Sequence, residues 1–92
     1  MARKARDIIQ PWDPPELDAD ELRALKALAA GKASDTQQLA ALAVIVNKLA
    51  GTYDLPFRPG VDGARATDFA CGKMFVGQRI VNAIKRPIPE KA

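Results

Sequence analysis

The spacing of apolar residues predicts a first helix over residues 19–30. Asp18 is a suitable N-cap, and Glu21 stands three residues later, which is the spacing of a capping box. Gly31 supplies the stop at the C-terminal end. Apolar side chains recur at three- and four-residue steps and build one face of the helix, namely Leu22, Leu25, Leu28 and Ala29.

A second helix is predicted over residues 35–50. Ser34 caps it, Gln37 completes a second capping box, and Gly51 ends it. The helix is apolar over most of its circumference, which predicts that it is the central element of the core. The apolar positions are Leu39, Leu42, Ala43, Ile45, Val46, Leu49 and Ala50.

A third helix is predicted over residues 68–85, with Thr67 as its cap. Gly72 and Gly77 lie inside it, where each costs roughly 1 kcal/mol relative to alanine. That cost indicates close approach of another backbone, either the second helix or another subunit. The apolar side chains fall on two sides, with Phe69, Val76, Ile80, Ala83 and Ile84 on one and Met74 and Val81 on the other.

The connection over residues 51–66 is rich in glycine and proline, which excludes regular structure. Connections of this length are often functional. We expect Leu55 and Phe57 to face inward, and Tyr53, Asp54 and Arg58 to be candidates for contacts. The pattern fits equally well a packed connector with an internal Asp54–Arg58 ion pair.

Both ends of the chain contain prolines that disfavour helix, at Pro11, Pro14, Pro15, Pro87 and Pro89. Residues 1–16 are therefore expected to form an extended arm, residues 17–86 the helical bundle and residues 87–92 a short tail. The expected fold class is all-α: a three-helix bundle with an extended N-terminal arm. The arm carries large apolar groups without periodicity, which we expect to anchor it on its own domain or on a partner: Ile8, Ile9 and Trp12.

The composition of the 92 residues offers little chemistry for catalysis. Cys71 stands alone and is expected to be a small buried hydrophobe on a helix, and the chain has no histidine. A zinc site and a hydrolase triad are thereby excluded, and no phosphate-binding loop or dinucleotide fingerprint is present. We expect no enzyme activity, no cofactor, no metal and no small-molecule substrate. No apolar run resembles a signal peptide or a membrane span, so synthesis in the cytoplasm without membrane contact is expected.

Charge is distributed unevenly along the chain, although the net charge is only +3. Carboxylates gather over residues 13–21, and cations dominate from residue 69 onward. Such acidic and basic blocks provide complementary surfaces for self-assembly or for a charged partner. Candidate phosphate contacts, directed at a nucleic-acid backbone and sensitive to salt, are Arg3, Lys4, Arg6, Lys85 and Arg86. The helix dipole also accounts for Lys85 and Arg86.

Two sequence segments resemble those of a family of small proteins from podovirus-type tailed phages, encoded near the virion structural genes. They are GTYDLPFRPG at residues 51–60 and DFACGKMFVGQRIV at residues 68–81. The resemblance implies a phage origin, and with it a place in the virion after synthesis in the host cytoplasm.

Three functions are consistent with the sequence. The first is a minor structural protein of a tailed phage that binds itself, capsid, portal or tail subunits, with Ile8, Ile9 and Trp12 anchoring the arm. Its loop contact would be formed by Tyr53, Phe57 and Arg58. The second is a packaging factor that contacts DNA without sequence specificity. The third is an inhibitor of a host protein.

Overall fold

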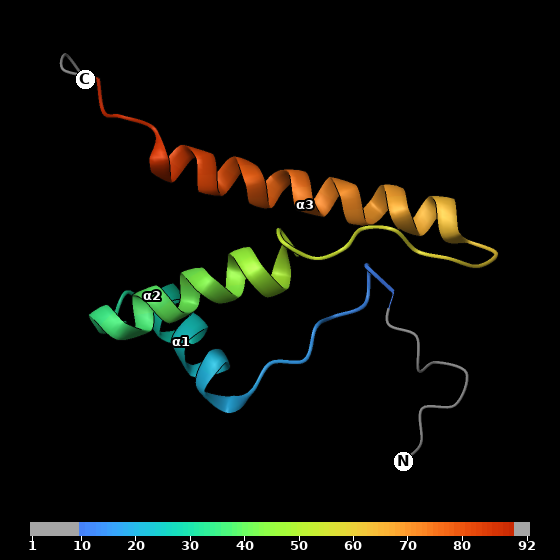
Figure 1. Cartoon of the computed structure of the whole chain (residues 1–92). Helices are drawn as coiled ribbons and strands as arrows, with labels where there is room; N and C mark the ends of the chain where they lie inside the picture. Colours follow the sequence, from blue (N-terminus) through green and yellow to red (C-terminus); the bar gives the residue numbers. More distant parts are fainter. Residues whose placement is uncertain (1–9, 90–92) are drawn as a thin grey trace.

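The computed structural model describes residues 10–89, and within this part of the chain the regular elements are all helices, with no strand. Its helices are α1 (Ala19–Ala29), α2 (Asp35–Ala43), the π-helix η2 (Val44–Leu49) and α3 (Gly63–Lys85). Because η2 continues α2 without a break, the chain forms three rods, and the predicted all-α class of small helical bundle is confirmed. Figure 1 shows α1 folded back on α2, with the long α3 beside the continuous α2–η2 rod.

The first two helices begin where the sequence predicts, because their caps are local. The Asp18 carboxylate accepts a hydrogen bond from the Glu21 N–H at 2.8 Å, and the Glu21 side chain accepts one from the Asp18 N–H at 3.0 Å. The same reciprocal pair joins Ser34 and Gln37 at 3.1 and 3.0 Å. Both capping boxes are confirmed, and each satisfies two otherwise unpaired donors.

The second rod ends in a π-helical turn that the sequence pattern did not predict. The Ala50 N–H donates to the Ile45 carbonyl at 2.9 Å, five residues back. Gly51 then adopts a left-handed φ of 62°, which brings Thr52 under the end of the helix. The Thr52 N–H and hydroxyl both donate to the Val46 carbonyl, at 3.1 and 2.6 Å, and Thr52 is buried. Thr52 therefore closes this end of η2.

The third helix begins at Gly63, so the predicted start at Asp68 with Thr67 as cap is wrong. Thr67 lies inside α3, and its hydroxyl accepts a hydrogen bond from the Arg58 N–H at 2.8 Å instead of capping the helix. A Cβ at Gly63 would collide with the Arg58 carbonyl oxygen. The first turns of α3 thus form against the preceding loop, and a contact of that kind is invisible to a local capping rule.

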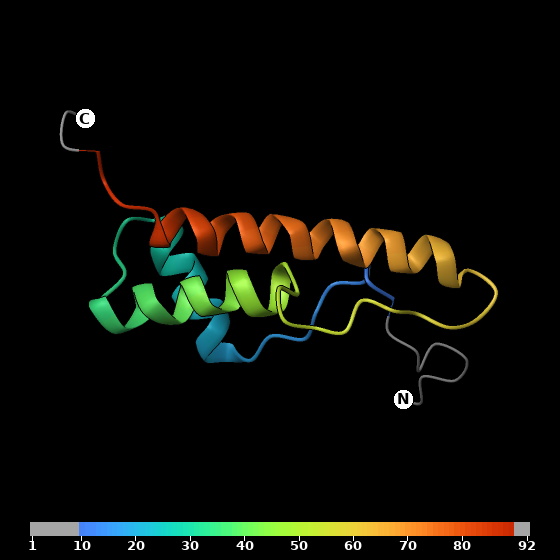
Figure 2. The ribbon, with the colours of Figure 1, turned by 45° about the horizontal axis from the view of Figure 1, so that its top comes forward.

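The third helix runs antiparallel to the α2–η2 rod and meets it through small residues (Figure 2). Its buried positions are Gly63, Ala66, Ala70 and Gly77. A Cβ at Gly77 would overlap the Thr52 hydroxyl oxygen and would lie 2.8 Å from the Thr52 Cβ. The close approach expected at Gly77 is therefore confirmed, and the neighbour belongs to the same chain.

The same expectation is wrong for Gly72. No atom lies within 4 Å of a Cβ built there, and the residue is exposed. Gly72 precedes Gly77 by five positions, which places it about 140° around the helix from the contact. Nothing in residues 10–89 requires a glycine at this position.

The two glycines give a matched pair of variants. Gly77→Ala should lower the free energy of unfolding by about 3 kcal/mol, because the added methyl has no space against Thr52. Gly72→Ala should raise it by roughly 0.5–1 kcal/mol, because alanine favours the helix and nothing obstructs its methyl. Urea unfolding followed by circular dichroism measures both. Equal effects of the two substitutions would contradict the close contact.

Candidate interaction surfaces

Apart from Pro11, the buried apolar side chains within residues 10–89 are alanines and valines. They are Ala24, Ala41, Val44, Val46, Ala50, Ala66 and Ala70. No leucine, isoleucine, methionine or aromatic residue within residues 10–89 is buried. Large apolar side chains are normally the first to be buried in a folded domain, so their exposure here is the feature that calls for a function.

A stripe of small residues on α3, here called the seam, explains this inversion. Gly77 meets Thr52 at the end of η2, and Ala70 lies beside Gly51 and Pro56 of the loop. At about 100° per residue, Ala66, Ala70 and Gly77 lie within roughly 40° of one another on α3. The larger residues fall on either side of this stripe, with Val76 and Ile80 on one side and Val81 on the other. Because the small residues bring the helices close together, the larger side chains are displaced to the two flanks.

One flank is an apolar groove of about 260 Å³ between α2 and the C-terminal half of α3, here called the Leu39 groove. Its rim is strongly exposed, with 71% of Leu39 and 61% of Ile84 accessible to solvent. Lys85 is the one charged residue of its lining, which consists of Leu39, Leu42, Ala43, Val46, Asn47, Tyr53, Val81, Ile84 and Lys85.

The other flank holds a second apolar groove, here called the Ile45 groove, of about 280 Å³. Lys73 is its one charged residue, and the lining consists of Ile45, Leu49, Ala50, Lys73, Val76 and Ile80. Side chains that the sequence pattern assigned to the core of the second and third helices, such as Leu49 and Val76, are therefore half exposed. Each groove is an open depression lined mainly by apolar side chains, which suits the side chains of another protein.

The loop between η2 and α3 turns its large side chains outward. Leu55 and Phe57 are 75% and 64% exposed, so the expectation that they face inward is wrong. The Arg58 guanidinium donates to the Leu55 and Phe57 carbonyls at 2.5 and 3.2 Å, which fixes the loop backbone at these two residues. No Asp54–Arg58 ion pair forms. Tyr53, 73% exposed, extends the surface, and we call Tyr53, Leu55 and Phe57 the loop surface.

The last residues of the predicted arm lie against α3 of the same chain. The Trp12 ring meets the Phe69 ring edge to face, with centroids 5.6 Å apart, and the Lys73 ammonium donates to the Pro11 carbonyl at 2.8 Å. Trp12 is still 44% exposed. The other two arm anchors, Ile8 and Ile9, lie outside the described residues.

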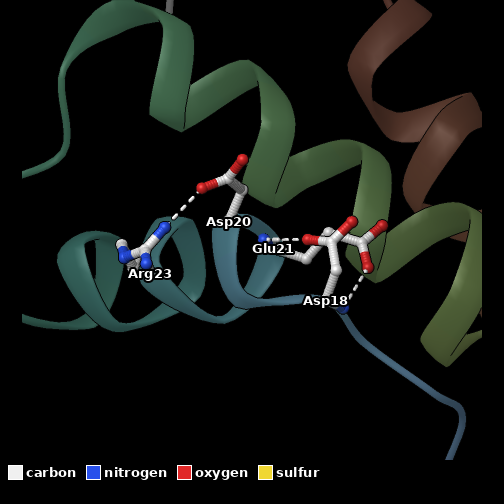
Figure 3. A network of polar contacts seen from close by, with 4 residues as sticks. All are labelled: Asp18, Asp20, Glu21 and Arg23. Atoms are coloured by element: carbon white, nitrogen blue, oxygen red, sulfur yellow. Dashed lines mark hydrogen bonds and ion pairs between the residues drawn. The ribbon is translucent and has the colours of Figure 1, made fainter.

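The acidic residues around α1 have structural partners. Asp18 and Glu21 form the cap already described, and Asp20 pairs with Arg23 on the outer face of the helix (Figure 3). Glu21 also reaches across to η2, where its carboxylate lies 2.8 Å from the Lys48 ammonium. That hydrogen bond from Lys48, with a second from the Asp18 N–H, lowers the pKa of Glu21 below its ordinary value of 4.5. The same hydrogen bond raises the pKa of Lys48 above 10.5, against the effect of burial.

The candidate phosphate contacts are only partly described. Arg3, Lys4 and Arg6 lie outside the described residues. Lys85 and Arg86 are exposed at the C-terminal end of α3, where cations complement the helix dipole. Lys85 also borders the Leu39 groove, so the structure places it beside apolar side chains.

The remaining chemical features of the described residues are few. Cys71 is exposed, so its expected burial is wrong, because it lies one residue and about 100° around α3 from the buried Ala70. No group of three or more His, Cys, Asp or Glu side chains within residues 10–89 could hold a metal ion. No helix in this part of the chain is long and apolar enough to cross a membrane.

Comparison of the chain with protein-family models, with curated proteins and with solved structures gives no match. The two grooves and the loop surface are therefore interpreted from their own geometry. Hydrophobic spacing in the sequence found the residues of these surfaces but assigned most of them to the core. The signal that could have separated core from surface is the stripe of alanine and glycine on α3.

The Glu21–Lys48 pair gives a pH-dependent prediction. Because the pKa of Glu21 is lowered on folding, its stabilising effect is present above pH 4.5 and is lost as the pH falls through the folded-state pKa. Because the pKa of Lys48 is raised, its effect is present below pH 10.5 and is lost as the pH rises through the folded-state pKa. Glu21→Gln keeps the capping acceptor and removes only the charge.

Wild type should therefore be more stable than Glu21→Gln near neutral pH, and the difference should shrink at both extremes. Urea midpoints measured across the pH range test this expectation. A difference that stays constant from acid to alkali would show that the ion pair does not link α1 to η2.

The exposed rim of the Leu39 groove gives a prediction about stability. Leu39→Ser should change the free energy of unfolding by less than about 0.5 kcal/mol, because the side chain is mostly in water already. Val44→Ala, which truncates a buried side chain of the same rod, should cost about 1–2 kcal/mol. Urea unfolding of the two variants, compared at low protein concentration, reads out the difference. A larger loss for Leu39→Ser would place Leu39 in the core.

Proposed function

We propose that this protein is a structural subunit that binds neighbouring proteins, and that the assembly is the particle of a tailed phage, in which it is a minor virion protein. The observation that carries the binding role is the exposure of its large apolar side chains around a core of alanine and valine. These side chains form two grooves and a loop surface, each on the outside of a folded helical body.

The energetics of burial support this role. Covering a leucine, isoleucine or phenylalanine contributes roughly 1.5–3 kcal/mol per side chain. In most domains of this size that free energy stabilises the fold itself. Here Leu39, Leu55 and Phe57 keep most of their surface in water, so the same free energy remains available for association.

The shape of the molecule supports the same role. Its principal extents are 51 × 32 × 16 Å, and the shortest of these accommodates about two helix layers at an interaxial distance of 8–10 Å. A plate of this kind has no interior layer covered on both faces. It exposes a large area relative to its mass, which favours contacts with more than one neighbour.

The assignment to a phage particle rests on the resemblance of residues 51–60 and 68–81 to small tailed-phage proteins. The first of these segments contains the loop surface, and the second contains the α3 residues Val76 and Ile80 that line the Ile45 groove. Capsid, portal or tail subunits are the neighbours that such a protein would contact. The loop surface and the Ile45 groove are the contacts we assign to them.

The loop surface offers the sharpest test of this role. A Leu55→Ser, Phe57→Ser double variant should fold normally, because both side chains are mostly exposed and border neither groove, but should be depleted at least tenfold from purified phage particles. Val61→Ser is the matched control, because Val61 is fully exposed and borders neither groove. Quantitative mass spectrometry of particles carrying each variant measures the copy number.

Absence of the wild-type chain from purified particles would contradict the virion role. Incorporation of the double variant at the wild-type level would contradict the loop contact. A loss with Val61→Ser equal to that of the double variant would show that the effect is not specific to the loop surface.

A further inference from the structure

We infer that the Leu39 groove receives a second copy of this chain, which inserts Ile88 of its C-terminal segment, residues 86–89. This inference rests on the proposed role as an assembly subunit and names the first partner of that subunit. The two parts of the contact, an exposed apolar side chain and an apolar groove, lie at the same end of the molecule.

The segment that follows α3 is an extended rod. Arg86 ends the helix with φ −72° and ψ 136°, which are polyproline II values. Pro87 and Pro89 confine the residues before them, Arg86 and Ile88, to extended conformations. At about 3.1 Å per residue, Ile88 stands roughly 9 Å beyond the last helical residue. It is 86% exposed, so the rod presents a β-branched side chain to the solvent.

The rod cannot return to the Leu39 groove of its own chain. Ile84 and Lys85, which line the groove, immediately precede the rod, so a return would need a sharp reversal within four residues. The prolines remove the helical conformations that such a turn uses. Figures 1 and 2 both show residues 86–89 leading away from the helical body. Ile88 therefore does not reach the Leu39 groove of its own chain and stays open to a second molecule.

The Leu39 groove of a second copy is a site that this short segment can reach. The groove ends at Ile84 and Lys85, so a two-fold axis near the C-terminal ends of two α3 helices places each rod beside the groove of the other chain. The contact is then reciprocal, and the same surface serves on both copies. Its volume of about 260 Å³ is large enough for the isoleucine side chain and the proline rings beside it.

The location of the rod distinguishes the two grooves. The Ile45 groove is lined by α3 residues from Lys73 to Ile80, at least five positions before the helix ends. The Leu39 groove reaches the last helical residue, Lys85. The reciprocal exchange thus covers one flank of α3, including Tyr53, and leaves the Ile45 groove and the Leu55 and Phe57 side chains of the loop surface free for other neighbours.

Sedimentation equilibrium of the full chain tests the exchange. Wild type should be a dimer, and Ile88→Asp and Leu39→Asp should each raise its dissociation constant roughly a hundredfold, tenfold for each of two equivalent contacts. Val61→Asp is the matched control, because Val61 is fully exposed and lies outside both grooves and the loop surface, and it should leave the dimer unchanged. Circular dichroism should show the same helix content in all four proteins.

Mixing the two aspartate variants separates exchange from general adhesion. In the mixed dimer, the intact rod of the Leu39→Asp chain meets the intact groove of the Ile88→Asp chain, so the mixture should associate about tenfold more tightly than either variant alone. A monomeric wild type, a dimer that ignores Ile88→Asp, or a mixture no tighter than its components would each overturn the inference. The last two outcomes leave the role in the phage particle standing, since incorporation into particles is measured separately.

Discussion

The contact between Gly77 of α3 and Thr52 at the end of η2 determines the rest of the structure. Thr52 is held there by two hydrogen bonds to the Val46 carbonyl, and a side chain at position 77 would occupy the same space as its hydroxyl. The axes of α3 and η2 therefore approach each other closely at this contact. Ala66 and Ala70 continue the seam toward the start of α3, where Ala70 lies beside Gly51 and Pro56 of the loop.

The close seam connects packing to function. When two helices approach through small residues, the larger side chains on either side cannot interdigitate and are left along the flanks. In this protein they line the Leu39 and Ile45 grooves, while Leu55 and Phe57 of the loop, whose carbonyls accept hydrogen bonds from Arg58, are exposed. The fold is thus stabilised by alanine, valine and backbone contacts, and the residues with the greatest burial energy remain available to partners.

The sequence predicted those features that depend on neighbouring residues. Both capping boxes, the ends of α1 and the overall extent of the second rod follow from local chemistry. The start of α3 was missed because Gly63 and Thr67 act through the Arg58 backbone, nine or fewer residues away in sequence but on a different element. The periodicity identified the apolar side of each helix correctly, but the large residues on these sides were wrongly assigned to the core. The prediction relied on large apolar residues, whereas the seam is formed by small ones. The inference that a glycine inside a helix indicates a close contact was correct at Gly77 and wrong at Gly72. Helix propensity alone does not tell which side of a helix is covered.

The central claim is tested most directly by a double-mutant cycle across the seam. The free energies of unfolding of wild type, Gly77→Ala, Thr52→Gly and the double variant give the coupling between the two positions. The account predicts a coupling of at least about 1.5 kcal/mol, with the double variant less destabilised than the sum of the single changes, because removing the Thr52 side chain makes room for the new methyl. Effects that add to within roughly 0.5 kcal/mol would show that the two residues do not set the approach of α3 to η2.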